Sequence, residues 1–207
     1  MLENEGDIEY KSIFMRCDEV NKDAYRTVPS LVSIERYKSG MEKIWADIQK
    51  ASGEFPESSN EEVTSYFINR FGSESISLTE RCFFLKDNKS EKYFGTCMAW
   101  EKKKDDKVIP VLHWLAVDSE YCGKGYARVL ITKVMKFFEI NNYNETVFLH
   151  TQPKSFKAIK LYSDFGFCLT AKDVYGIAAN ESEESISLLE KYMKDETILV
   201  LKQRMIL

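Results

Sequence analysis

Apolar and polar residues in the first third of the chain change from strand-like to helical spacing. Residues 31–37 alternate with a period of two, which predicts a strand. Residues 41–48 place apolar side chains at helical spacing, and Gly53 follows as a helix stop. Ser59 and Glu62 stand at capping-box spacing, so a second helix is predicted to begin there.

The spacing then becomes typical of strands. Residues 81–86 and 93–100 predict two short strands joined by a polar turn, and residues 108–117 predict a third. The charged run 101–107 is predicted to be a solvated hairpin loop rather than a binding segment. Because proline is disfavoured inside a central strand, Pro110 predicts a bulge or a sheet edge.

Helices and strands alternate in the rest of the chain. The pattern predicts an amphipathic helix from Tyr126 onward, a strand over 146–151 and a helix over 156–164. In the C-terminal segment, residues 186–193 are predicted to be helical and residues 198–201 to form a last strand. The order of elements in the middle of the chain predicts an α/β (α+β) fold with a sheet of mixed strand directions.

Composition indicates how this fold is organised. The chain has 207 residues, of which 44% are hydrophobic and 30% charged, as is usual for a globular protein. We expect a polar N-terminal extension over residues 1–30 and one domain over residues 31–207. The sequence shows no apolar run of the roughly 20 residues that span a bilayer, so no membrane partner is expected. The N-terminus is acidic and lacks the apolar core of a signal peptide, which favours a cytoplasmic location.

Charge and residue usage exclude several classes of site. A formal charge of −4 argues against a nucleic-acid partner and is weakly compatible with a cationic or neutral small substrate. The five cysteines contain no C-x-x-C pair, which indicates neither a disulfide framework nor a zinc cage. With only two histidines as well, no metal site is expected.

The most informative segment is a glycine turn that joins a strand to a helix. The strand ends at Val117, Gly123 and Gly125 flank Lys124, and the helical pattern begins at once. The first N–H groups of a helix have no partner within the helix and lie at the positive end of its dipole. The segment therefore predicts an anion site suited to a phosphate group.

Four features in a fixed order extend this motif. They are the strand 115–117, the turn 122–127, the later strand 147–149, and the segment 155–167, which reads SFKAIKLYSDFGF. The series resembles the GNAT superfamily of acetyl-CoA-dependent N-acetyltransferases, which writes the turn Gln/Arg-x-x-Gly-x-Gly/Ala and the later helix Asn-x-x-Ala-x-x-Leu-Tyr followed by Gly-Phe.

The likeness continues upstream of the glycine turn. Residues 45–55, 95–100 and 113–117 look like a common bacterial subgroup of that superfamily. The resemblance covers roughly residues 31–168 and implies the GNAT fold, a mixed, twisted sheet with helices on both faces.

The resemblance also implies how coenzyme A is held. The strand 115–117 would pair with the pantetheine amides as if with another strand, and the N–H groups of 123–127 would receive the pyrophosphate. Lys124 and Arg128 either add positive charge there or are simply solvated. The implied cofactor-binding residues are Leu115, Ala116, Val117, Cys122, Gly123, Lys124, Gly125, Tyr126, Ala127, Arg128 and Ser155.

Two positions depart from the family pattern. Cys122 stands where Gln or Arg is usual, and Ser155 where Asn is usual. Because backbone amides supply most of the anion site, we expect binding to survive the first change. The second is milder, since a serine hydroxyl can still cap a helix or bond to the cofactor. Cys122 has no partner base visible in the sequence, which disfavours a nucleophilic role.

The resemblance implies that Tyr162 is the acid that protonates the coenzyme A sulfur, and a phenol is protonated at neutral pH. If the resemblance is set aside, the favoured interpretation is that the Tyr162 ring simply packs between a helix and the sheet. His113 is a candidate base, two residues before Leu115 on the same side of the strand, or a histidine bonded within the sheet. His150 is a weaker candidate, and water as the only base is a further alternative. Glu54 either attracts a cationic amine or is solvated at a helix end.

These features predict direct transfer of an acetyl group from acetyl-CoA to a primary amine in a ternary complex. The acceptor, a small molecule or a peptide, is not identified by the sequence, and a homodimer is one option because dimers are common among similar proteins. An alternative hypothesis is a regulatory or sensor module that binds coenzyme A with little catalysis. A plain nucleotide-binding domain is disfavoured, since the chain has neither a G-x-G-x-x-G nor a Walker lysine motif.

Overall fold

The computed structural model describes residues 8–104, 106–143, 146–171 and 179–206. The chain forms two compact units, and each is described by itself. Unit 1 comprises Met1–Ala24, Glu101–Val111 and Asn144–Leu207, and unit 2 comprises Tyr25–Trp100 and Leu112–Tyr143. Strands β4 (Tyr93–Lys104) and β5 (Lys107–Val117) contribute residues to both units.

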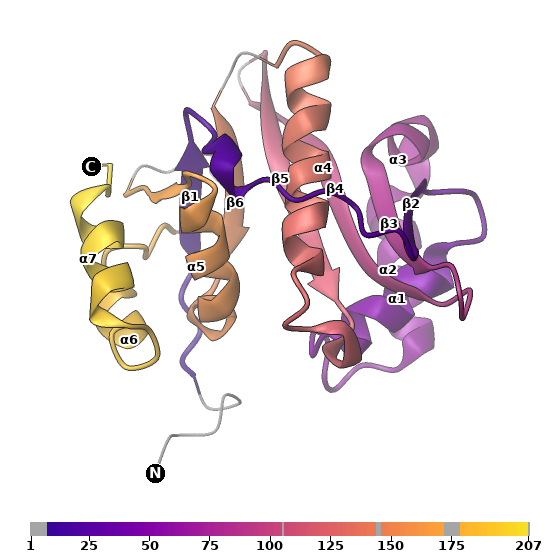
Figure 1. Cartoon of the computed structure of the whole chain (residues 1–207), viewed down its shortest axis with the longest axis horizontal. Coiled ribbons are helices and arrows are strands. Elements are labelled where there is room, and N and C mark those ends of the chain that lie inside the picture. The colour runs from indigo at the N-terminus through magenta and orange to yellow at the C-terminus, as the bar shows by residue number, and fades with distance from the viewer. Residues whose placement is uncertain (1–7, 105, 144–145, 172–178, 207) are drawn as a thin grey trace. The chain divides into compact units, whose positions relative to one another are not determined.

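Unit 2 contains a sheet with helices on its two faces (Figure 1). Its strand β3 pairs antiparallel with β2 on one side and with β4 on the other. Besides parts of β4 and β5, its elements are β2 (Val32–Arg36), α1 (Glu42–Ala51), α2 (Asn60–Phe71), α3 (Ser75–Arg81), β3 (Cys82–Asp87) and α4 (Tyr126–Ile140).

The helix signals of the sequence act as predicted. The Ser59 hydroxyl accepts a hydrogen bond from Glu62 N at 3.2 Å, and the Glu62 carboxylate accepts one from Ser59 N at 2.7 Å. This reciprocal pair confirms the capping box and starts α2. Gly53 follows α1 with φ of +93°, a left-handed conformation that stops the helix as expected.

One hydrophobic core cluster of unit 2 lies on the face of the sheet that α1 and α2 cover. Because adjacent residues of a strand point to opposite faces, Gly95 of β4 faces α4 instead. A side chain added at Gly95 would approach the Leu130 side chain of α4 to 3.2 Å, so glycine lets α4 pack close to the sheet. The buried residues of the cluster on the α1/α2 face are Tyr37, Met41, Trp45, Ala46, Ile48, Val63, Phe67, Phe71, Leu78, Cys82, Phe84, Met98, Trp100 and Ala116.

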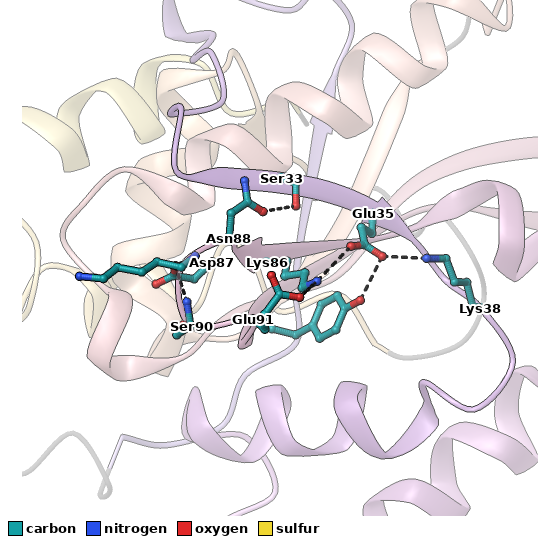
Figure 2. Close-up of polar contacts among 10 residues, drawn as sticks. Ser33, Glu35, Lys38, Lys86, Asp87, Asn88, Ser90 and Glu91 are labelled. Atoms are coloured by element: carbon teal, nitrogen blue, oxygen red, sulfur yellow. Dashed lines mark hydrogen bonds and ion pairs between the residues drawn. The ribbon is translucent and has the colours of Figure 1, made fainter.

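Polar side chains tie β2 to its neighbours (Figure 2). The Glu35 carboxylate accepts hydrogen bonds from Lys38 Nζ at 2.9 Å and from the Tyr93 hydroxyl at 3.0 Å. Ser33 donates to Asn88 Oδ1 at 2.8 Å. The bonds from Lys38 and Tyr93 lower the pKa of Glu35, because hydrogen bonds to the charged carboxylate favour it. The Ser33–Asn88 bond joins β2 to the residue that follows β3.

Unit 1 contains β1 (Ile13–Cys17), which pairs antiparallel with both β6 (Val147–Thr151) and β7 (Cys168–Leu169). In the same unit, β5 pairs parallel with β6 through Val111 and Phe148. The strands of this chain therefore run in mixed directions, as predicted. The helices of unit 1 are α5 (Phe156–Asp164), α6 (Ile186–Leu189) and α7 (Asp195–Gln203).

The structure differs from the expectation of a polar extension over residues 1–30. Residues 13–17 form β1, and four of these five residues are buried. Because the strand is paired on both sides, its near-continuous apolar character suits a sheet interior rather than an extension. The division into units also does not follow the expected boundary at residue 31.

Two further sequence predictions were wrong. The charged run 101–107 is mostly strand, since β4 continues to Lys104 and β5 begins at Lys107. Asp106 takes φ of +63°, which a tight hairpin connection requires. Residues 198–201 belong to α7, where Ile198 and Leu201 are buried at helical spacing while Leu199 between them is 55% exposed. Strand β5 also contains a residue with left-handed backbone, Trp114 with φ of +50°.

Candidate functional site

The glycine turn of unit 2 is open to solvent. Residues 122–125 are exposed, and Gly125 is the N-cap of α4 with φ of +83°. A side chain added at Gly125 would meet no atom within 4 Å, so its backbone conformation, not lack of space, requires glycine. The helix that follows is 15 residues long and has no acidic residue in its first turn. No carboxylate of that turn therefore offsets the positive end of the helix dipole, which favours the binding of an external anion.

A buried aspartate holds the approach to this turn. Asp118 N donates to Phe94 O at 2.8 Å, and Asp118 Oδ1 accepts from Glu120 N at 3.0 Å. The other carboxylate oxygen lies 2.9 Å from Lys92 Nζ. Asp118 and Glu120 together raise the pKa of Lys92 above its ordinary value through hydrogen bonds and charge. The loop that presents the turn is thus fixed to β4 before any ligand arrives.

Two predicted cofactor residues make local contacts at the turn. Lys124 Nζ donates to Glu120 O at 3.4 Å and lies 5.2 Å from the ring centre of Tyr121. The exposed Cys122 donates its thiol hydrogen to Val117 O at 3.8 Å. The structure therefore places the thiol against the strand end, where it replaces the long polar side chain usual in the family pattern.

The strand before the turn contains a strained residue. Trp114 takes φ of +50°, which is rare for a bulky side chain, and it precedes the predicted pantetheine-binding residues 115–117. Ala116 and Val117 are buried, whereas Leu115 is half-buried. The irregularity interrupts the alternation of side chains, as at a β-bulge.

His113 lies beside Trp114 as a result. Its ring centre is 5.5 Å from that of Trp114 and 6.2 Å from that of Phe71, a core residue on the α1/α2 face. Simple alternation predicts that His113 and Trp114 face opposite sides. The structure instead brings both rings to the face that α1 and α2 cover.

An aromatic cluster occupies this face, and the sequence did not indicate that its rings meet. The rings of Phe55, Tyr66 and Trp114, which we call the aromatic wall, lie with centres 5.5 to 5.8 Å apart. All three side chains are at least partly accessible, and the fully buried Trp45 packs under them, 5.3 Å from Trp114. Helical spacing had indicated Tyr66 and Trp45 as core positions, and nothing in the sequence brings Phe55 and Trp114 together.

The other predicted site residues belong to unit 1. Tyr162 of α5 is 7% exposed, and its ring centre lies 6.0 Å from that of Phe167. Ser155 occupies the N-cap position of α5, but its hydroxyl does not make the capping hydrogen bond that was considered. His150 stacks on Phe14 at 4.7 Å, and its Nε2 is 2.8 Å from the Ser12 hydroxyl.

The predicted site residues are divided between the two units. Unit 2 contains the glycine turn, the 115–117 strand end, His113 and the aromatic wall, and within it His113 lies beside Trp114. Tyr162 and Ser155 are described within unit 1 only. In the part of the chain that the structure describes, no three His, Cys, Asp or Glu side chains are grouped to hold a metal ion. No helix in that part is long and apolar enough to cross a membrane.

Residues 42–167 match the acetyltransferase (GNAT) family. This is more than half of the chain, and it contains the glycine turn and α4. The chain belongs to the GNAT family. Members of this family use acetyl-CoA, and the fold predicted from the sequence resemblance is confirmed.

Curated relatives of this GNAT chain are N-acetyltransferases and N-acetylaspartate synthetases. Human N-acetyltransferase 8B is 28% identical over 121 residues, which are 57% of this chain and 48% of the relative. N-acetylaspartate synthetase of Danio rerio is 37% identical over 70 residues, which are 34% of this chain and 24% of the relative. The chain thus spans about half the length, or less, of the curated relatives it matches.

Solved structures show the same fold. A GCN5-related N-acetyltransferase from Sphaerobacter thermophilus superposes with a TM-score of 0.56 at 16% identity, over 77% of this chain and 48% of that chain. PH1933 from Pyrococcus horikoshii OT3 superposes with a TM-score of 0.54 at 24% identity, over 71% of this chain and 92% of that chain.

Proposed function

We propose that this protein transfers an acetyl group from acetyl-CoA directly to a primary amine. The observation that carries the proposal is the exposed N-terminus of α4, entered through Gly125 and free of acidic residues in its first turn. That arrangement fits a pyrophosphate, and the family match makes coenzyme A the pyrophosphate-bearing molecule of choice. The N–H groups of 123–127 and the cations Lys124 and Arg128 would hold it.

When bound, acetyl-CoA supplies the thioester carbon to which the amine nitrogen bonds as the carbon–sulfur bond breaks. A backbone N–H near Val117 would donate a hydrogen bond to the thioester oxygen. His113, or water, would accept the proton that the amine loses, and the Tyr162 hydroxyl would donate a proton to the departing sulfur. Catalytic roles for His113 and Tyr162, and a role for Ser155 in binding the cofactor, are part of this proposal.

The alternative, a coenzyme-A-binding regulatory module, is not favoured, because the curated relatives are named as N-acetyltransferases or synthetases of an N-acetylated product. These relatives are vertebrate proteins, so membership of a bacterial subgroup stays a prediction. The cytoplasmic location, the absence of nucleic-acid and membrane partners, and the homodimer also stay predictions.

Calorimetric titration with acetyl-CoA and then with coenzyme A tests the proposed cofactor. Micromolar binding is expected, and no binding at millimolar cofactor would reject the proposal. The conservative variant Tyr162→Phe then tests the enzyme. We expect kcat to fall by about 100-fold, because the phenol proton is lost, with little change in the Kd for acetyl-CoA. An unchanged kcat would remove Tyr162 from the mechanism.

A further inference from the structure

Three buried polar atoms without a hydrogen-bond partner gather at the aromatic wall. In the described part of the chain, Trp45 Nε1, Gln49 Oε1 and Trp114 Nε1 are the buried side-chain nitrogen or oxygen atoms that lack one. Trp45 and Gln49 stand one helical turn apart on α1, and both are 0% exposed. Gln49 Nε2 donates weakly to the backbone oxygen of Trp114 at 3.4 Å, so the three side chains are neighbours.

Buried polar atoms that lack a hydrogen-bond partner within the protein are costly to the fold. Buried polar groups are nearly always hydrogen-bonded, and each unpaired one destabilises the fold. Their concentration at one place indicates that a bound molecule completes them. Two indole N–H groups offer hydrogens, and one amide oxygen accepts one. The bound molecule would therefore carry both an acceptor and a donor beside an apolar surface.

Backbone strain marks the same place independently. Phe55 and Trp114 both adopt left-handed backbone, with φ of +54° and +50°, and their rings stack on each other with planes 21° apart. Among the residues that the structure describes, the other left-handed ones that are not glycine are polar: Glu91, Asp106 and Asn142. A bulky aromatic residue in this conformation is strained, and such strain is typically kept at ligand sites.

Nearby carboxylates and the candidate base His113 favour an amine as the ligand of the aromatic wall. Glu54, half-buried, and Glu57, exposed, follow α1 on either side of Phe55 in the chain. Aromatic faces attract cations, and nearby carboxylates add to that attraction. His113, whose ring centre is 5.5 Å from Trp114, is placed to take a proton from an amine held at the wall.

We propose that the aromatic wall is the acceptor-recognition site and that the acceptor is an arylalkylamine, a primary amine joined by a short aliphatic chain to an aromatic ring with a polar substituent. This inference rests on the proposed acetyl transfer and names its substrate class. The flat ring stacks on Phe55 and Trp114, and the substituent pairs with the indole N–H groups and Gln49 Oε1. Polyamines and sugars lack the flat apolar face that the wall matches.

A matched pair of amines tests the proposal on the full-length protein. Phenethylamine and 2-cyclohexylethylamine have similar apolar size, but only the first has a π face. With acetyl-CoA in excess, thiol release should show a KM about tenfold lower for phenethylamine, and tyramine should bind more tightly still through its hydroxyl. Equal KM values, or preference for the saturated amine, would overturn the aromatic recognition and leave acetyl transfer standing.

Direct binding separates the two proposals. If neither amine is acetylated, calorimetry in the presence of coenzyme A decides, because selective binding of phenethylamine supports the wall and its absence overturns it. Failure of coenzyme A itself to bind would reject the proposed function, and the substrate class would be rejected with it.

Two variants locate the site on the wall. Phe55→Leu should raise the KM for phenethylamine about tenfold, whereas Phe137→Leu, which removes a ring from α4, should not change it. Gln49→Leu removes an unpaired buried oxygen, so it should weaken tyramine binding without lowering the melting temperature or the affinity for coenzyme A. A Gln49→Leu variant that binds tyramine as well as the parent would overturn the role of this oxygen.

Discussion

The glycine turn and the aromatic wall use the same left-handed backbone for opposite purposes. At the turn, glycines occupy this conformation at little cost, with φ of +77° at Gly123 and +83° at Gly125. At the wall, Phe55 and Trp114 occupy it at a cost of about 1–2 kcal/mol each.

The difference follows from what each place offers a ligand. The turn presents backbone N–H groups, so any side chain there is dispensable and glycine suffices. The wall presents ring faces and indole N–H groups, so the side chains must stay even though the backbone resists them. The first site is therefore defined by a motif, and the second by strain that other packing must maintain.

The largest effect is expected from a substitution in the glycine turn. Gly125→Val forces a β-branched residue into left-handed backbone and should raise the Kd for acetyl-CoA about tenfold or more. Isothermal titration calorimetry measures it. Gly40→Val is the matched control, since Gly40 also has positive φ and open space around its Cβ but lies before α1. Equal loss of affinity in both variants would mean that the effect is general destabilisation.

At the wall, a glycine variant should be more stable than an alanine variant, which reverses the usual order of stability. Because Phe55 has positive φ, we expect Phe55→Gly to be more stable than Phe55→Ala by about 1 kcal/mol in urea unfolding. At Phe137, inside α4, the order should be normal, with alanine more stable by about 1 kcal/mol. Normal order at both positions would show that Phe55 carries no backbone strain.

Substitution of His150 should change the pH dependence of stability, whereas substitution of His113 should change activity. Burial lowers the pKa of His150 below its ordinary 6.5, and the positive charge of Lys102 lowers it further. The folded state therefore favours the neutral ring of His150. The contribution of this ring to the free energy of unfolding is present above pH 6.5 and is lost as the pH falls through the lowered pKa. His150→Gln should flatten this loss, measured as unfolding free energy from about pH 7 to about pH 5.

His113→Gln should act on activity. It should lower kcat, measured by steady-state kinetics, because a candidate base beside the wall is removed. A fall in kcat with His150→Gln, and none with His113→Gln, would exchange the roles proposed for the two residues.

Much of unit 2 could be predicted from the sequence, because its signals are local. The Ser59–Glu62 capping box, the Gly53 stop and the glycine turn each specify a backbone conformation within a few residues. The candidate anion site was predicted from such local signals alone. Elements whose character depends on distant partners were predicted less well: β1 was interpreted as an extension, and α7 as a strand.

The sequence by itself determined the order of most elements, the family and the position of the candidate phosphate site, since these depend on short-range patterns of glycine, caps and apolar spacing. The tertiary structure decided that residues 13–17 are a paired, buried strand and that His113 and Trp114 share a face. It also brought Phe55 from the end of α1 against Trp114 of β5. The physical reason is that strand pairing and ring stacking join residues far apart in the chain, and no local spacing encodes such contacts.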